Sequence, residues 1–175
     1  MMKKLTWCAG GVFLALVSLS AGIANASRLQ ARVVVTQSEV PQGMTERKLI
    51  AFAKSHQAKR LMETKDAPLK QRKWLADMVV AFNVSPADSE YHALFYDVTG
   101  GNRRFVDDMA IMVSDPKQRT FLQKLKLRRS QFEPGRKYEI VVTVRRNEVG
   151  KLQFETVGEH ERRSGRVDFT DEQAK

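Results

Sequence analysis

The sequence predicts a mainly β protein, an antiparallel β-sandwich of about seven strands with one α-helix inserted after the first strand. Three observations lead to this fold class. Apolar and polar residues alternate through most of residues 74–157, which is the period of a strand. Turn residues recur about every ten to fifteen positions, too closely for the crossovers that parallel strands need. Only residues 45–64 have the spacing of an amphipathic helix.

The first strand and the helix lie close together in the sequence. The strand is expected within residues 27–40, where apolar residues fall on alternate positions until Pro41 ends the pattern. The helix is expected over residues 45–64, because Thr45 is a good N-cap and no glycine or proline follows before Pro68.

The middle strands differ in the faces that they bury. Residues 74–84 carry apolar side chains on both faces, so this strand is expected to be central and covered on both sides. A strand over residues 91–99 leads into a hairpin at Gly100-Gly101-Asn102. The strand after the hairpin is expected to turn four residues inward: Phe105, Met109, Ile111 and Val113. Asp107 falls on the same stripe, and an arginine partner, a β-bulge or a slip of the period would each account for it.

The last strands complete the expected domain, which spans residues 27–158. Residues 120–129 alternate, with Phe121, Leu125 and Leu127 on one face and with Lys124, Lys126 and Arg128 on the other. Four residues then make an inward stripe: Tyr138, Ile140, Val142 and Val144. A loop is expected over residues 146–150 and a final strand over residues 151–157. Residues 159–175 form a charged tail that is expected to fray.

Residues 1–26 have the layout of a secretory signal peptide. A basic start is followed by an apolar stretch over residues 12–19 and by the small-x-small ending Ala24-Asn25-Ala26. We therefore expect export by a bacterial Sec-type route to the periplasm or the medium, with an uncleaved N-terminal anchor as the alternative. Cys8 precedes the apolar stretch, so lipidation is not expected.

Composition excludes several kinds of protein. The chain has 175 residues and a net charge of +10, and removal of residues 1–26 leaves 149 residues with a charge of +8. The single cysteine, Cys8, lies in the segment that would be removed. The mature chain therefore has no disulfide scaffold, no cysteine-ligated metal and no cysteine nucleophile.

The sequence LRRSQFEPGRKYEIVVTV, residues 127–144, resembles the E–F corner of fibronectin type III and related immunoglobulin-like sandwiches. In that corner a turn precedes a tyrosine that opens an alternating strand, and Tyr138 holds the matching place. The resemblance implies that its hydroxyl bonds backbone just upstream, and it implies a sandwich without indicating an activity. The sequence departs from the family's pattern in two ways. Trp74 opens its strand instead of lying at the core position of the next strand. The helix lies between the first and second strands, where the family normally has a short turn. The alternative is a helix-grip fold, one curved antiparallel sheet around the helix.

No catalytic constellation stands out, so an enzyme, a metal site and a cofactor are not expected. His56, His92 and His160 are far apart and lack metal-ligand spacing. No nucleophile motif is present, and the adjacent acids Asp107 and Asp108 point to opposite faces of a strand.

The basic residues are the best functional lead. Lys124, Lys126 and Arg128 share one face of a strand, and an exported protein of charge +8 attracts anionic lipids and envelope polymers. The alternative is a solvated surface whose cations protect a sheet edge. Nucleic acid is not an expected partner, because the aromatic residues fall on inward positions. The basic helix offers contact with a membrane surface, although packing onto the sheet explains its apolar face better.

Two functions follow. The first is a non-enzymatic, exported binding or structural accessory of the bacterial cell envelope, with a protein or an anionic polymer as partner. The second is a small-ligand carrier or hydrolase with a pocket between helix and sheet, beneath Leu49, Phe52 and His56 and containing Asp107. The oligomeric state does not follow from the sequence.

Overall fold

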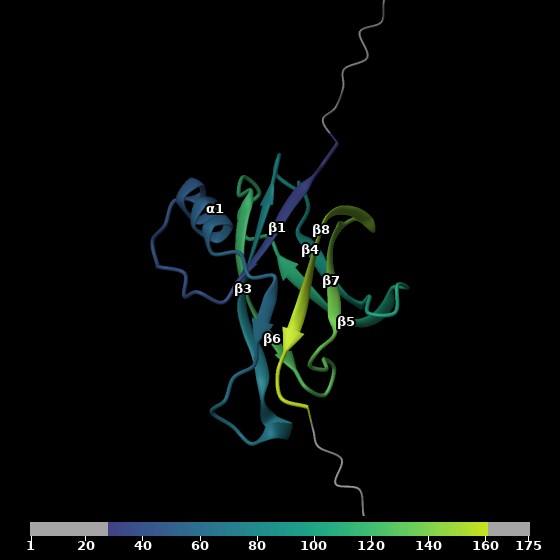
Figure 1. Cartoon of the computed structure of the whole chain (residues 1–175). Coiled ribbons are helices and arrows are strands. Elements are labelled where there is room, and N and C mark those ends of the chain that lie inside the picture. Colours follow the sequence, from purple (N-terminus) through teal and green to yellow (C-terminus); the bar gives the residue numbers. More distant parts are fainter. Residues whose placement is uncertain (1–27, 161–175) are drawn as a thin grey trace, which may run out of the picture.

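Two β-sheets face each other across one apolar core in the computed structural model, which describes residues 28–160 (Figure 1). The expected signal peptide, residues 1–26, lies outside the described residues, as does the tail from residue 161 onward. Five strands form one sheet in the order β2-β8-β7-β4-β5, and three form the other in the order β1-β3-β6. The strands are β1 (Ala31–Thr36), β2 (Arg60–Met62), β3 (Lys73–Phe82), β4 (Glu90–Asp97), β5 (Arg104–Met112), β6 (Thr120–Arg128), β7 (Lys137–Val144) and β8 (Asn147–Val157).

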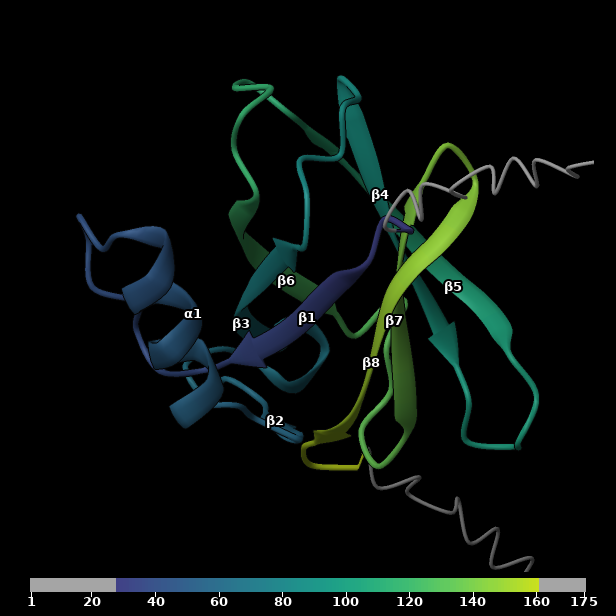
Figure 2. The ribbon, with the colours of Figure 1, turned by 90° about the horizontal axis from the view of Figure 1, so that it is seen from above.

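The expected sandwich with a helix after the first strand is therefore confirmed, and the helix-grip alternative is wrong. All strand pairs are antiparallel except that of β2 with β8, which is parallel. The helix does not lie inside a curved sheet, because the inner faces of the two sheets pack directly on each other. Figure 2 shows the helix beside the three-stranded sheet, on the side away from the five-stranded sheet.

The core is built from the alternate residues of the long strands. The inner side chains of β7 are the expected four, Tyr138, Ile140, Val142 and Val144, and all are buried. The rings of Phe82 and Phe121 contact Tyr91 of the opposite sheet, at centroid distances of 5.3 and 5.2 Å. Aromatic residues thus join the two layers, where each ring buries a large apolar area.

The helix α1 (Glu46–Ser55) covers part of the outer face of the three-stranded sheet. Leu49 and the fully buried Ala53 pack on Val34 of β1 and Val79 of β3. Strand β3 is therefore central, as its apolar pattern predicts, and it is covered on both sides at Val79, whereas the helix leaves Leu75 exposed. No helix within residues 28–160 is long and apolar enough to cross a membrane.

The expected helix over residues 45–64 is too long, because α1 ends at Ser55 and a strand follows. The backbone N–H of Ala58 donates to the Val35 carbonyl at 2.8 Å, and β2 then pairs with β8. Leu61 fits the helical period, yet it is fully buried in the core between the sheets. Pairing with a distant strand overrides local propensity here.

Phe105 does not face inward, and a β-bulge explains why. The pairing of β4 with β5 shifts between Phe95 and Tyr96, so that Val106 is the extra residue. Val106 packs on the core, whereas Phe105 is 57% exposed and contacts Tyr96 on the outer face. A β-bulge is present in β5, as one of the three explanations for Asp107 expects, but it displaces Phe105, and Asp107 remains the register partner of the buried Phe95.

The loop expected over residues 146–150 is instead a tight turn, and β8 already begins at Asn147. Arg145 and Arg146 form the turn with φ of 50° and 67°, as a type I′ hairpin requires. Arginine rarely adopts this conformation, so the sequence gives no turn signature there. Gly150 lies within β8, and glycine is required there because a Cβ at this position would be 2.3 Å from the carbonyl oxygen of Ala31.

We expect Arg146→Gly to stabilise the protein. Glycine adopts positive φ without steric cost, and the expected gain in the free energy of unfolding is about 0.5–1 kcal/mol. Chemical denaturation measures it. Lys151→Gly, within β8, is the control and should destabilise, because glycine weakens a strand interior. A loss of stability in Arg146→Gly would contradict the prediction.

Candidate functional site

The basic face lies on the outer surface of the three-stranded sheet, where α1 leaves β3 and β6 uncovered. It consists of Lys73 of β3 and of Lys124, Lys126 and Arg128 of β6. The inner residues of β6 are buried in the core, so the alternation of the strand turns the three cations outward. Register places Lys73 directly opposite Arg128, which brings two positive charges side by side.

The cations of the basic face are not neutralised by neighbouring acids. None of them forms an ion pair with a carboxylate of residues 28–160. Asp77 is the register partner of Lys124, but their side chains do not form an ion pair either. Asp77 offsets part of the charge at Lys124, whereas Lys126 and Arg128 have no acidic register partner in β3. Like charges gathered on one surface create a positive potential that attracts anions.

Two leucines interrupt the charge on the same surface. Leu75 and Leu122 are 44% and 43% exposed: Leu75 lies opposite Lys126, and Leu122 precedes Lys124 on the outward stripe of β6. Beside them a groove of about 660 Å³ runs between residues 39–44 and β6, and its lining includes Leu49, Leu122 and Lys124. The basic face is therefore a partly apolar, hollowed surface.

The helix adds further positive charge to the same side of the molecule. Arg47, Lys48 and Lys54 of α1 are exposed, whereas Leu49 and Ala53 contact the sheet. Figure 2 shows α1 outside the sheet that β1, β3 and β6 form. The apolar stripe of the helix is thus used for packing, as its spacing predicts.

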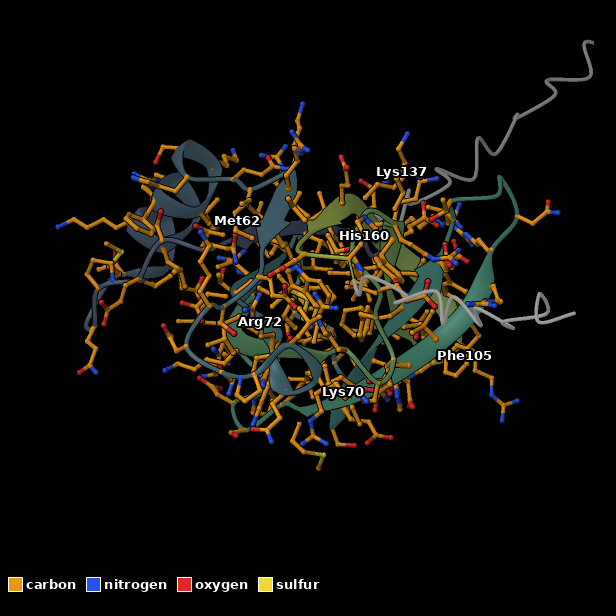
Figure 3. The ribbon with its side chains drawn as sticks, turned by 60° about the horizontal axis from the view of Figure 1, so that its bottom comes forward. Met62, Lys70, Arg72, Phe105, Lys137 and His160 are labelled. Carbon is orange, nitrogen blue, oxygen red and sulfur yellow. The ribbon has the colours of Figure 1, made fainter. Side chains whose placement is uncertain are left out.

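A second group of cations lies at the lower end of the sandwich, where Lys70, Arg72 and His160 are labelled (Figure 3). A cavity of about 790 Å³ opens there, and its lining includes Lys70, Arg129, Arg136 and His160. Its arginines are paired with acids. Arg136 donates to Glu133 and Asp97, at 2.7 and 3.2 Å.

Glu63 is the centre of the ion pairs at this lower end. Its carboxylate is only 4% exposed and accepts two hydrogen bonds from Arg129, one of them at 2.8 Å. The Arg129 guanidinium also lies over the ring of Trp74, whose indole N–H donates to the Val157 carbonyl at 2.9 Å. These contacts join β3 and β8 with the loop after β6, so this cluster closes the sandwich.

The carboxyls in this region remain ionised well into the acidic range. Burial opposes the ionisation of Glu63, but the hydrogen bonds and charge of Arg129 outweigh it, and the pKa of Glu63 is lowered. Burial likewise opposes ionisation of Asp97, and its bonds from Thr99 with the nearby Arg136 lower its pKa. The arginines of the lower end therefore have acidic partners, unlike the cations of the basic face.

Tyr138 has the geometry that the corner resemblance implies. Its hydroxyl accepts a hydrogen bond of 2.8 Å from the backbone N–H of Glu133, and its ring contacts Phe132 and Phe154. Burial raises the pKa of the Tyr138 phenol. Tyr91 is also buried, but its hydroxyl has no hydrogen-bond partner within residues 28–160, and burial raises its pKa further.

The structure separates the histidines and fills the space under the helix. His56 stacks on Phe52 at the end of α1, His92 lies in β4, and His160 lines the lower cavity. No three histidine, cysteine or acidic side chains among the described residues gather as a metal site would require. Leu49 and Ala53 pack on the outer face of one sheet, whereas Asp107 belongs to the other sheet. The pocket that the carrier alternative needs is not formed by these residues.

Sequence reasoning found the three cations of β6 and missed their neighbours. Lys73 and Leu75 join them because β3 pairs with β6 in one particular register, whereas Leu122 lies on the same outward stripe of β6 as the cations. The outward alternation of Lys73 and Leu75 in β3 was visible in the sequence, but its partner strand lies about fifty residues further on.

The structure thus defines a two-layer β-sandwich that carries a basic face on one sheet. No family model matches the chain, and no curated protein matches it either. Among solved structures it is similar to an immunoglobulin-like protein from Pseudomonas aeruginosa, with 11% sequence identity and a TM-score of 0.39. The similarity covers 74% of this chain and 97% of the other. The similarity indicates no activity, ligand or partner for this chain.

Tyr138→Phe and Tyr91→Phe should have different effects on stability. The first removes a buried hydrogen bond and leaves the Glu133 N–H unpaired, so we expect a loss of about 1 kcal/mol in the free energy of unfolding. The second removes a hydroxyl without a partner among the described residues, so we expect no loss or a gain of up to about 1 kcal/mol. Urea unfolding compares them, and equal losses would argue against a structural role for the Tyr138 bond.

Acid should weaken the closure of the lower end. Because the pKa of Glu63 is lower in the folded chain than in the unfolded chain, its contribution is complete above the unfolded value and disappears as pH falls through the folded value. Melting temperatures recorded from pH 7 to about pH 2.5 should therefore fall less steeply below about pH 4 in Glu63→Gln. Glu39→Gln, an exposed position, is the control. Parallel curves for Glu63→Gln and the parent protein would contradict this.

Proposed function

We propose that this protein is an exported, non-enzymatic β-sandwich that binds an anionic partner of the bacterial cell envelope through its basic face. The observation that carries this proposal is the group of four cations without acidic partners in residues 28–160, gathered on the outer surface of β3 and β6. The partner is an envelope protein or an anionic polymer or lipid surface, and the protein serves as a binding or structural accessory.

The spacing of the cations suits an extended anionic ligand. Alternate residues of a strand are about 7 Å apart, so Lys124, Lys126 and Arg128 form a row with that repeat. Lys73 widens the row at its lower end, opposite Arg128. A polymer or a segment with regularly spaced negative charges would contact several of these cations together.

The contrast with the lower end supports the choice of site. Arg129 and Arg136 also face a cavity, but their charges are paired with Glu63, Glu133 and Asp97. An anion bound there would compete with acids already in place. On the basic face no such competitor lies within ion-pair distance among the described residues, so an external anion gains more.

Two sequence features support export and a role without catalysis. Residues 1–26 have the order of basic, apolar and small residues that signal peptides share, and no cysteine follows them. No three metal-ligating side chains gather among the described residues, and Leu49 and Ala53 of α1 pack on the sheet. Ser55 Oγ lies 2.9 Å from His56 Nδ1, but this pair is exposed and the Ser55 hydroxyl donates to the Phe52 carbonyl of its own helix. The basic face therefore offers a partner its charge and its shape.

Binding to vesicles tests the proposal. We expect the mature protein to bind vesicles of phosphatidylglycerol and phosphatidylcholine, or purified lipopolysaccharide, and to lose affinity about tenfold between 50 and 200 mM salt. The triple variant Lys124→Glu, Lys126→Glu, Arg128→Glu should lose binding and keep its circular dichroism spectrum, because all three side chains are exposed.

The control has the same change in net charge at other exposed lysines: Lys59→Glu, Lys117→Glu, Lys151→Glu. It should keep most of the affinity if the basic face is the site. Equal losses in both variants would show attraction by net charge alone, and they would overturn the assignment to this face. Capture from the native envelope with the parent chain and the triple variant then identifies which partner depends on the basic face.

A further inference from the structure

We propose that the partner of the basic face is a protein that contributes an extended acidic segment, which pairs with the free edge of β6 as an additional strand. This inference rests on the proposed function and names the class of partner. Its two supports are the open backbone edge of β6 and the position of the cations along that edge.

Strand β6 is an edge strand, and the outward backbone groups of its middle residues have no partner among the described residues. At its ends the carbonyls of Thr120 and Arg128 accept hydrogen bonds from nearby loop residues. Within residues 28–160 it pairs with β3 alone. Phe82 donates its N–H to the Arg119 carbonyl at 2.8 Å, which fixes the alternation of inward and outward backbone groups along the pair. By that alternation Phe121, Gln123, Leu125 and Leu127 turn their N–H and C=O groups to β3. Leu122, Lys124 and Lys126 turn theirs away from the sheet.

The residues with outward backbone groups are the same residues that bear the outer side chains. In an added antiparallel strand, the residues opposite Lys124 and Lys126 would point to the same outer face, about 5 Å away. Glutamate or aspartate at those alternate positions would form ion pairs with the lysines. The edge therefore favours a strand with an acidic residue at every second position, and a smaller apolar residue beside Leu122.

The other edges of the sandwich offer less. The edge of β1 is approached by β8, since a Cβ at Gly150 would lie 2.3 Å from the Ala31 carbonyl oxygen. Strand β5 bears a bulge and two adjacent acids, Asp107 and Asp108. Bulges and mixed charges hinder the pairing of an edge.

A second copy of this chain fits the edge poorly. Antiparallel pairing of two β6 strands would place lysine or arginine against lysine or arginine, and like charges directly opposite destabilise a pair. The same cations that disfavour self-association favour an acidic strand, so charge complementarity selects the occupant. Main-chain hydrogen bonds would supply affinity, and the acidic residues would supply selectivity.

Synthetic peptides test the proposal on the mature protein. We expect acetyl-(Glu-Thr)5-amide to bind, and the neutral acetyl-(Gln-Thr)5-amide to bind at least about tenfold more weakly. Two further peptides carry N-methyl groups on every Glu or on every Thr. N-methyl-Glu removes the donors used in antiparallel addition and N-methyl-Thr those used in parallel addition, so one of the two should bind at least about tenfold more weakly than the parent peptide.

A matched pair of protein variants tests the edge itself. Leu122→Pro removes an outward N–H without changing the charge, and proline is tolerated on an edge at such a position. Peptide affinity should fall at least about tenfold in Leu122→Pro and much less in Leu122→Ala. If Leu122→Pro unfolds, the N-methyl peptides still test the proposal on the unaltered protein.

The results separate this inference from the proposed function. Vesicle or polymer binding that depends on Lys124, Lys126 and Arg128, together with equal affinity for all acidic peptides, would overturn strand addition and keep the basic face as the site. Loss of both peptide and vesicle binding in the triple variant, with sensitivity to one N-methyl series, would support both. Equal peptide affinity in the parent protein and in the triple variant would overturn both.

Discussion

The packing of two sheets through their inner faces is the constraint on which the rest of this molecule depends. Each strand gives every second side chain to the core, and the residues between them must lie outside. In β6 the inward choice of Phe121, Leu125 and Leu127 leaves no other place for the lysines than the outer surface. The basic face is thus a direct result of the same alternation that buries the core. A change that shifted this register by one residue would place charge between the sheets.

The helix decides how much of that outer surface remains available. It covers Val34 and Val79 with Leu49 and Ala53, and it leaves the side of the sheet formed by β6 open. No helix among the described residues covers the outer face of the five-stranded sheet. The side chain of Arg103, just before β5, covers part of that face instead. Arg103 lies over Tyr96 and reaches the buried Glu139 at 2.6 Å. Lys137 of β7 and Lys151 of β8 are also exposed without an ion pair to the described residues, but they are single cations on different strands. The row of three cations on alternate residues of β6 gives the three-stranded sheet a different outer surface.

Charge has two distinct roles in this chain. At the lower end, Glu63 and Asp97 hold arginines from separate loops, and their lowered pKa values indicate that these contacts persist in moderate acid. Those pairs connect segments that are far apart in the sequence. Because the carboxylates of Glu63 and Asp97 are buried, removal of their arginine partners leaves a buried charge. On β6 the cations have no such structural task. Their replacement should change binding more than folding, and this difference is what makes the two roles separable by experiment.

The sequence by itself determined the class of fold, most strand positions, the three cations of β6 and the tyrosine at the corner, because alternation and turn residues are local properties. It could not determine where the helix ends, since Leu61 satisfies a helical period and only the pairing of β2 with β8 makes it a strand residue. Nor could it locate Phe105, because a bulge is visible only in a pair of strands. The same limit applies to the site: Lys73 and Leu75 became neighbours of the β6 cations through tertiary register, which depends on contacts between distant segments and leaves no local pattern.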